Sequence, residues 1–233
     1  MESSLTEYLA RFVSERRNRL FLDIVAMRTR YITVAIEDVY QPHNASAVLR
    51  TCDCLGVQDV HIIENYNKFE TNPEVALGAS NWLTIHKYSY GSNSSLEAIK
   101  RLREENYRIV ATLPHSNDVL LDDFCLEKGK AALFFGTEKE GLSETVMKHA
   151  DEFLRIPMKG FTESFNISVS AAIILYQLTE RLRRLKTDWG LTAAEKDEVR
   201  LEWLKKSVKS AGLLEKRFYE RKADRRGAGE NKE

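Results

Sequence analysis

The sequence has few cysteines, no net charge and no apolar segment long enough to cross a membrane. Its three cysteines cannot all pair with one another, and no nearby set of cysteines and histidines completes a zinc site, so we expect reduced thiols in or near the core. The longest apolar candidate, Ala171–Leu178, is short and ends in Thr179-Glu180-Arg181. The N-terminus also lacks the basic-then-apolar layout of a signal peptide. We therefore expect a cytoplasmic protein that binds neither a membrane nor a metal ion.

Because the net charge is zero, composition alone does not indicate a polyanionic partner, but the C-terminal residues differ from the rest. From Lys205 to Glu233 the chain has ten lysines and arginines against five acidic residues. Phe218 and Tyr219 lie between the basic pairs, and basic residues interleaved with aromatic ones suit phosphate contacts and base stacking. A solvated, partly disordered tail is the alternative that this composition allows.

What the sequence does have is a series of short apolar segments. Hydrophobic residues make up 43% of the chain and charged residues 30%, which fits one packed soluble domain with appendages. The apolar segments predict strands covered on both faces at 31–36, 59–63, 108–113, 131–135 and 153–157. Helical patterns separate them at 45–55, at 94–105, where Ser94 and Glu97 suggest a capping box, and at 142–150. This alternation predicts an α/β domain with a mainly parallel sheet.

Further helices are expected at both ends of the chain. A helical spacing that leads to three arginines predicts an N-terminal amphipathic helix, formed by Leu5, Tyr8, Leu9, Phe12 and Val13. An apolar stripe from Ile167 to Leu185 predicts a long helix, and a capping box of Thr192 with Glu195 opens a last one. We divide the chain into an N-terminal helical extension (1–30), a central domain (31–186) and a C-terminal basic extension (187–233).

Three polar segments lie where strands give way to helices. Residues 41–51 include Asn44, near the expected start of a helix, and Arg50 within that helix. Residues 133–143 carry two glycines after a buried strand, where glycine lets the backbone approach a ligand closely. Residues 156–170 include four closely spaced polar residues at the start of the long helix: Ser164, Asn166, Ser168 and Ser170. One helix cap requires fewer polar residues than this.

In this order, the three segments resemble the motifs of the TrmH family of SPOUT-class RNA 2′-O-methyltransferases. The resemblance covers roughly Leu5 to Arg184, and the short N-terminal helix points to the tRNA branch, whose typical member methylates guanosine 18 of the D-loop. It implies a parallel α/β sheet with a C-terminal trefoil knot, S-adenosylmethionine as cofactor and tRNA as partner. Family members are usually homodimers, and the apolar stripe of the long helix serves either that contact or the core of one chain.

The resemblance also implies which residues form the site. The cofactor contacts are expected at Thr112, Gly136, Ile156, Met158 and Phe165. The reaction centre is expected at Asn44, Arg50, Glu138, Ser164 and Asn166.

Roles for the reaction-centre residues follow from their chemistry. A guanidinium stays protonated near neutral pH, so Arg50 is expected to clamp a phosphate and the developing alkoxide. A transiently deprotonated Arg50 that acts as the base is the alternative. Asn44, Ser164 and Asn166 would orient the ribose and hold Arg50, and Glu138 would fix Arg50 or its loop. RNA contact would fall to the basic C-terminal segment and to four N-terminal arginines: Arg11, Arg16, Arg17 and Arg19.

Two other functions compete with this hypothesis. A ribosomal RNA 2′-O-methyltransferase would keep the chemistry, but such relatives often carry a separate N-terminal RNA-binding domain, whereas about thirty residues precede the first expected strand here. A non-catalytic RNA-binding protein on the same fold is disfavoured, because all five residues of the expected reaction centre are present.

Overall fold

The computed structural model describes residues 4–70, 72–89, 93–113, 119–137 and 140–230, with side chains up to residue 223. The chain divides into two compact units. One is formed by Thr29–Gly190, and the other combines Met1–Arg28 with Leu191–Glu233. The N-terminal and C-terminal extensions of the sequence therefore belong to one compact unit.

The larger unit is built on a seven-stranded sheet in the order β3-β2-β1-β6-β4-β7-β5. Every strand pair among the described residues is parallel, so the predicted mainly parallel sheet is confirmed. The strands are β1 (Ile32–Glu37), β2 (Asp59–Ile63), β3 (Thr84–Tyr88), β4 (Arg108–Thr112), β5 (Val119–Leu120), β6 (Ala131–Phe135) and β7 (Glu152–Arg155).

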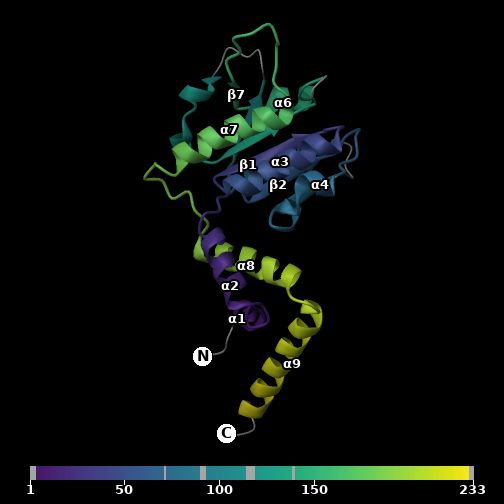
Figure 1. Ribbon diagram of the computed structural model, residues 1–233, viewed down its shortest axis with the longest axis vertical. Coiled ribbons are helices and arrows are strands. Elements are labelled where there is room, and N and C mark those ends of the chain that lie inside the picture. The colour runs from purple at the N-terminus through teal and green to yellow at the C-terminus, as the bar shows by residue number, and fades with distance from the viewer. Residues whose placement is uncertain (1–3, 71, 90–92, 114–118, 138–139, 231–233) are drawn as a thin grey trace. The chain divides into compact units, whose positions relative to one another are not determined.

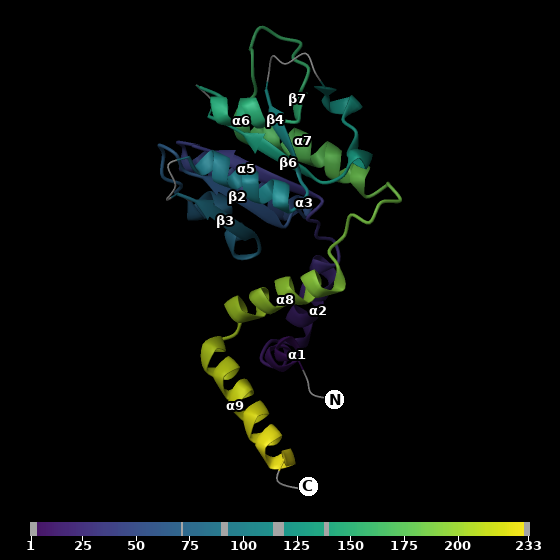
Figure 2. The same ribbon diagram turned by 180° about the vertical axis from the view of Figure 1, so that it is seen from behind.

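Helices cover both faces of this sheet. On one face lie α3 (Pro42–Leu55) and α7 (Ile167–Leu182), which pack against each other (Figure 1). The opposite face carries α5 (Ser94–Glu104) and α6 (Glu144–His149), as the reverse view shows (Figure 2). The short helix α4 (Pro73–Ala76) follows β2 and contacts α3. Because both faces are covered, every residue of the central strands β1 and β6 is buried.

The sequence predicted five of these strands and missed two. The missed strand β3 has an edge position, and its sequence Thr-Ile-His-Lys-Tyr mixes apolar with polar residues, so it offers no continuous apolar run. The other, β5, has only two residues. Helix α5 is capped by Asn93, whose side chain accepts the Leu96 N–H, so the predicted capping role of Ser94 is wrong.

The long apolar stripe of α7 lies in the core of its own unit. Ile167, Ala171, Ile174, Leu175, Leu178 and Leu182 are buried there, which confirms the core alternative for these residues. Cys52 is buried, Cys125 is half-buried and Cys54 is exposed, and none of the three forms a disulfide bond. The expectation of a position in or near the core is therefore wrong for Cys54.

Between residues 4 and 28 and between 191 and 230, the second unit has four helices and is called the helical unit below: α1 (Leu5–Ala10), α2 (Glu15–Val25), α8 (Ala193–Ser207) and α9 (Ala211–Glu230). The predicted N-terminal helix is confirmed only for its first part, because α1 ends at Ala10. Ser14 caps a second helix with its hydroxyl, and this second helix carries Arg16, Arg17 and Arg19. Trp203 forms the centre of the unit, with its ring 5.7 Å from that of Phe21 and 5.3 Å from the guanidinium carbon of Arg28. The predicted capping box of Thr192 and Glu195 is confirmed. No helix in the described part of the chain is both long and apolar enough to span a membrane.

Candidate functional site

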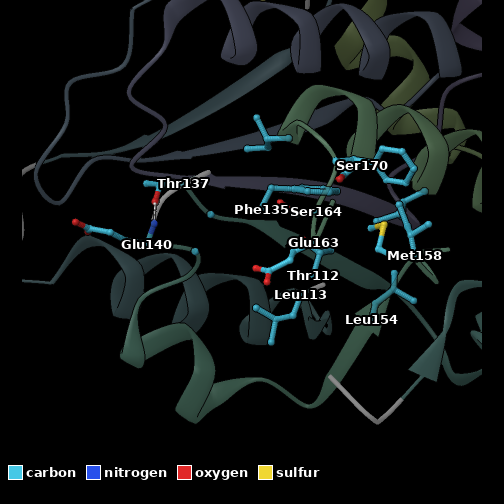
Figure 3. A pocket seen from close by; sticks show the side chains of 16 residues that line it. Thr112, Leu113, Phe135, Thr137, Glu140, Leu154, Met158, Glu163, Ser164 and Ser170 are labelled. Carbon is cyan, nitrogen blue, oxygen red and sulfur yellow. Dashed lines mark hydrogen bonds between the residues drawn. The ribbon is translucent and has the colours of Figure 1, made fainter. Parts of the chain in front are cut away.

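A cavity of about 310 Å³ opens where strands β4, β6 and β7 end. Thr112 closes β4, Phe135 closes β6, and Leu154 and Ile156 come from the end of β7 and the residues after it. Ligands of parallel α/β sheets bind beyond the carboxyl ends of the strands. The first turns of α7 complete the wall with Ser170 and Ile174, so the third polar segment of the sequence folds over this end of the sheet (Figure 3).

All five residues predicted to contact the cofactor lie on the wall of this cavity. They are Thr112, Gly136, Ile156, Met158 and Phe165. The Thr112 hydroxyl donates to the Phe134 carbonyl at 2.7 Å, which ties β4 to β6 at the cavity. Figure 3 shows Met158 beside Leu154 at one end, with Thr137 and Glu140 at the other. Their role in cofactor binding stays a prediction.

The loop after β6 is closed on itself and needs glycine at its first position. The Thr137 N–H donates to the Gly141 carbonyl at 3.0 Å, and the Gly141 N–H donates back to the Thr137 carbonyl at 3.1 Å. A Cβ atom on Gly136 would lie 2.2 Å from the Gly141 oxygen and 2.5 Å from the Leu142 nitrogen. Gly141 itself adopts a φ of +72°, which favours glycine. The backbone of this loop therefore forms the cavity wall directly.

The buried carboxylate of Glu37 forms hydrogen bonds with Ser143, directly after this loop. Glu37 ends β1, and its carboxylate accepts the Ser143 N–H and the Ser143 hydroxyl, both at 2.7 Å. The Ser95 hydroxyl also donates to it. Ser143 in turn caps α6. Glu37 is not among the residues predicted from the sequence, although an acidic residue directly after an apolar run is a recognisable signal.

The first and third polar segments meet at a pair of asparagines. The Asn166 side-chain amide donates to the Asn44 Oδ1 at 3.2 Å, across 122 positions of the chain. Asn44 is buried on α3 and also donates to Gln41 at 3.1 Å. Asn166 caps α7 through the Ser168 N–H. Two of the five predicted reaction-centre residues are thus in contact, while helix capping explains part of their placement.

The remaining predicted residues are placed differently. Ser164 lies on the cavity wall. Arg50 is exposed on α3, six positions after Asn44, and is not among the described residues that line the cavity. Glu138 lies outside the residues that the structure describes.

Two acidic residues that the sequence analysis did not select also line the cavity. Glu163 precedes Ser164, and Glu140 lies on the loop after β6, where its N–H donates to the Thr137 hydroxyl at 2.9 Å (Figure 3). Their carboxylates add negative charge to a wall of mixed apolar and polar residues, which favours a cationic ligand. Among the described residues, no cluster of three or more histidines, cysteines or acidic groups is arranged to hold a metal ion.

A second group of titratable residues lies on β2 and β3. Burial, together with the neighbouring His86, lowers the pKa of His61 to about 3. The His61 Nδ1 lies 2.9 Å from the Tyr88 hydroxyl, and burial raises the pKa of Tyr88 to about 12. Burial alone would raise the pKa of Asp59, but the hydrogen bond with His86 and the charge of Arg30 outweigh it, so this pKa lies below its ordinary value. These groups form a structural network in the sheet and do not line the cavity.

Comparison with known proteins gives consistent results. The chain is 41% identical over 207 residues to a tRNA (guanosine(18)-2′-O)-methyltransferase of Borreliella burgdorferi, covering 89% of this chain and 93% of that one. The enzyme of the same name from Thermus thermophilus is 34% identical over 166 residues, covering 70% and 82%. The crystal structure of the A. aeolicus TrmH/SpoU tRNA modifying enzyme superimposes with a TM-score of 0.72 at 26% identity, covering 84% and 98%. Residues 31–176 match the model of the SpoU rRNA Methylase family, and the chain belongs to this family.

Proposed function

We propose that this protein transfers a methyl group from S-adenosylmethionine to the ribose 2′-hydroxyl of guanosine 18 in tRNA. Two findings together carry this proposal. The chain belongs to the family, and all five residues expected to contact the cofactor line one cavity at the ends of β4, β6 and β7. The relatives that share 41% and 34% identity are named for this reaction. A 23S rRNA (guanosine-2′-O-)-methyltransferase is 30% identical over 157 residues, so ribosomal RNA is the second substrate to assay.

The residues of the cavity fit S-adenosylmethionine. Apolar side chains such as Leu113, Leu154 and Met158 suit a nucleoside base, and the carboxylates of Glu140 and Glu163 suit a cation. The closed loop at Gly136 exposes backbone groups rather than a side chain to the ligand. When bound, the sulfonium supplies an electrophilic methyl carbon.

The chain's own residues then serve to orient the ribose and to stabilise charge. The hydrogen bond between Asn44 and Asn166 joins the start of α7 to α3. Ser164 presents a hydroxyl at the cavity wall. Arg50 is an exposed cation on the same helix as Asn44, available to a phosphate and to the negative charge that develops on the 2′-oxygen. Glu138 keeps the proposed role of fixing Arg50 or its loop.

The trefoil knot belongs to the same proposal. Helix α7 packs on α3. It also forms hydrogen bonds with residues 121–124, a segment between β5 and β6. Arg181 donates to the Leu121 and Phe124 carbonyls at 2.9 and 2.6 Å. Gln177 donates to the Asp122 carboxylate at 2.5 Å. These contacts support a path in which the chain after β7 passes between α3 and that segment.

We also propose that the protein is a homodimer. The buried stripe of α7 is used within one chain, but Val169 and Tyr176 on the helix are exposed, as is Phe165 just before it. A second copy of the chain that covers this face would bring the cavity walls of the two copies close together. Light scattering after size-exclusion chromatography tests this, and a Val169→Glu variant is expected to shift the mass to that of a monomer.

RNA contact is assigned to the basic residues of the helical unit, and the cytoplasm is the proposed location. Arg11, Arg16, Arg17 and Arg19 are all exposed, as are Lys216, Arg217 and Arg221 on α9. Residues 191–233 cannot simply be removed to test this, because Trp203 forms the centre of that unit. Replacing Arg16, Arg17 and Arg19 together by alanine is expected to weaken tRNA binding and to reduce its salt dependence.

A methylation assay with labelled S-adenosylmethionine and unmodified transcripts tests the function. The wild-type protein is expected to label tRNA and not 23S rRNA fragments. Arg50→Ala is expected to lower kcat at least about 100-fold, the usual loss when a transition-state charge partner is removed, and to leave the cofactor Kd within about twofold. Lys100→Ala is the matched control, because it removes an exposed cation from α5 on the other face of the sheet. Normal turnover by Arg50→Ala would show that the clamp model is wrong.

A further inference from the structure

A second cavity, of about 430 Å³, adjoins the first. The two cavities share four wall residues: Gly136, Thr137, Glu140 and Ile167. The shared wall therefore consists of the closed loop after β6 and the first residue of α7. Thr137 and Glu140 lie at the end of the first cavity that is opposite Met158 and Leu154 (Figure 3). A ligand in the second cavity would lie directly across this loop from a cofactor in the first.

The rest of the second cavity comes from the segment between β1 and α3 and from the loop after β2. Tyr40 and Gln41 contribute from the first, and Asn67 contributes from the second. Gln41 accepts a hydrogen bond from Asn44, one of the proposed reaction-centre residues. Ile167 directly follows Asn166. Two of the proposed reaction-centre residues, Asn44 and Asn166, are thus direct neighbours of residues in the wall of the second cavity.

Hydrogen bonds of Asp38 join the segment between β1 and α3 to the loop after β2. Asp38 adopts a φ of +51°, and its carboxylate accepts the N–H groups of Asn65, Tyr66 and Asn67 at 2.7, 2.9 and 3.2 Å. The Asn67 side chain donates back to the Asp38 carbonyl at 2.9 Å. These bonds hold the chain just before Tyr40, so this part of the rim is organised before a ligand arrives.

Tyr40 lies on the rim with 77% of its surface exposed, and its ring contacts no other ring in the described part of the chain. An exposed aromatic side chain on a fixed backbone, beside a cavity of nucleoside size, is the arrangement by which proteins stack an unpaired base. Stacking of this kind accepts any base, so it would position the nucleoside rather than select it.

We propose that the second cavity binds the acceptor nucleoside of the RNA and that Tyr40 stacks on its base. This inference rests on the proposed function, which supplies the RNA substrate and the position of the acceptor. Tyr40 is a binding residue for that nucleoside. Tyr66, which is 92% exposed and does not line the cavity, provides a control of the same residue type on a neighbouring loop.

Kinetics of Tyr40 variants give the first test. Tyr40→Ala is expected to lower kcat/KM for tRNA at least about tenfold, with the S-adenosylmethionine Kd within about twofold and an unchanged Tm. Tyr40→Phe keeps the ring and is expected to restore kcat/KM to within about twofold of wild type. Tyr66→Ala is expected to behave like wild type. Equal losses at Tyr40 and Tyr66, or no loss at Tyr40, would overturn the proposal.

A double-mutant cycle with the RNA gives the second test, because it detects direct contact. The affinity of each protein is measured for the tRNA transcript and for one that carries an abasic ribose at the acceptor position. Tyr40→Ala is expected to weaken binding of the first about tenfold and to leave binding of the second unchanged. An equal loss with both RNAs would show that Tyr40 does not touch the acceptor base. If the wild-type protein methylates no RNA, the proposed function itself fails, and the inference fails with it.

Discussion

Replacement of Gly136 by alanine probes the wall that separates the two cavities. The added Cβ would lie 2.2 Å from the Gly141 oxygen and 2.3 Å from the Gly141 carbonyl carbon. Both atoms belong to the backbone, so no side-chain rotation can relieve the overlap. The loop must open, which breaks the two hydrogen bonds between Thr137 and Gly141.

The size of the effect follows from those two bonds. At a net value of about 1 kcal/mol each, their loss costs about 2 kcal/mol, which lowers the equilibrium constant between the closed and the open loop about 30-fold. If S-adenosylmethionine binds only the closed loop, its Kd rises by up to this factor, and by the whole of it once the open loop is the main state. The global Tm changes less, because the opening is confined to one loop at the edge of the core.

Isothermal titration calorimetry with S-adenosylmethionine measures this effect. Gly160→Ala is the matched control, because a Cβ there meets nothing within 4 Å and the residue has no positive φ. The control is expected to bind within about twofold of wild type. A Gly136→Ala protein that binds equally well would refute the assignment of the closed loop to the cofactor site.

Three further predictions concern groups outside that wall. Glu37→Gln removes a buried charge that accepts three hydrogen bonds and is expected to lower the free energy of unfolding by about 2–3 kcal/mol, measured by urea titration. His61 has a pKa of about 3 in the folded chain against 6.5 for the free side chain, so the unfolded chain binds more protons between these values. Acidification below pH 6.5 should therefore lower the free energy of unfolding by up to about 1.4 kcal/mol per pH unit. In His61→Gln, urea titrations at several pH values should show a smaller decrease of this free energy per pH unit. Trp203→Ala should lower the free energy of unfolding of the helical unit by about 3–5 kcal/mol, which would appear as faster proteolysis of that unit. Calorimetry should show that the variant still binds S-adenosylmethionine like the wild type.

The central sheet could be predicted from sequence because its strands are buried on both faces. A short continuous apolar run between two helical patterns, such as 131–135, is typical of a strand that helices cover on both faces. The edge strand β3 could not be found in this way, since only Tyr88 among its five residues is buried and the strand has no apolar run. Likewise, helical spacing joined Leu5 to Val13 in one helix with a basic end, although α1 ends at Ala10 and the Ser14 hydroxyl starts a second helix.

The site could be predicted only in part, for a related reason. Motif resemblance pointed to Thr112 and Met158, which lie more than forty residues apart but on one cavity wall. It did not point to Glu37, whose importance depends on which backbone and hydroxyl groups the fold brings to it. Tyr40 was missed because its exposure and its position on the rim are properties of the folded chain.

Mass-spectrometric mapping of an unmodified tRNA transcript, incubated with the purified protein and S-adenosylmethionine, tests the central claim most directly. The account predicts one new 2′-O-methylated guanosine, located in the D-loop at position 18. A transcript that stays unmodified, or one that carries the methyl group on a base rather than on a ribose, would contradict it.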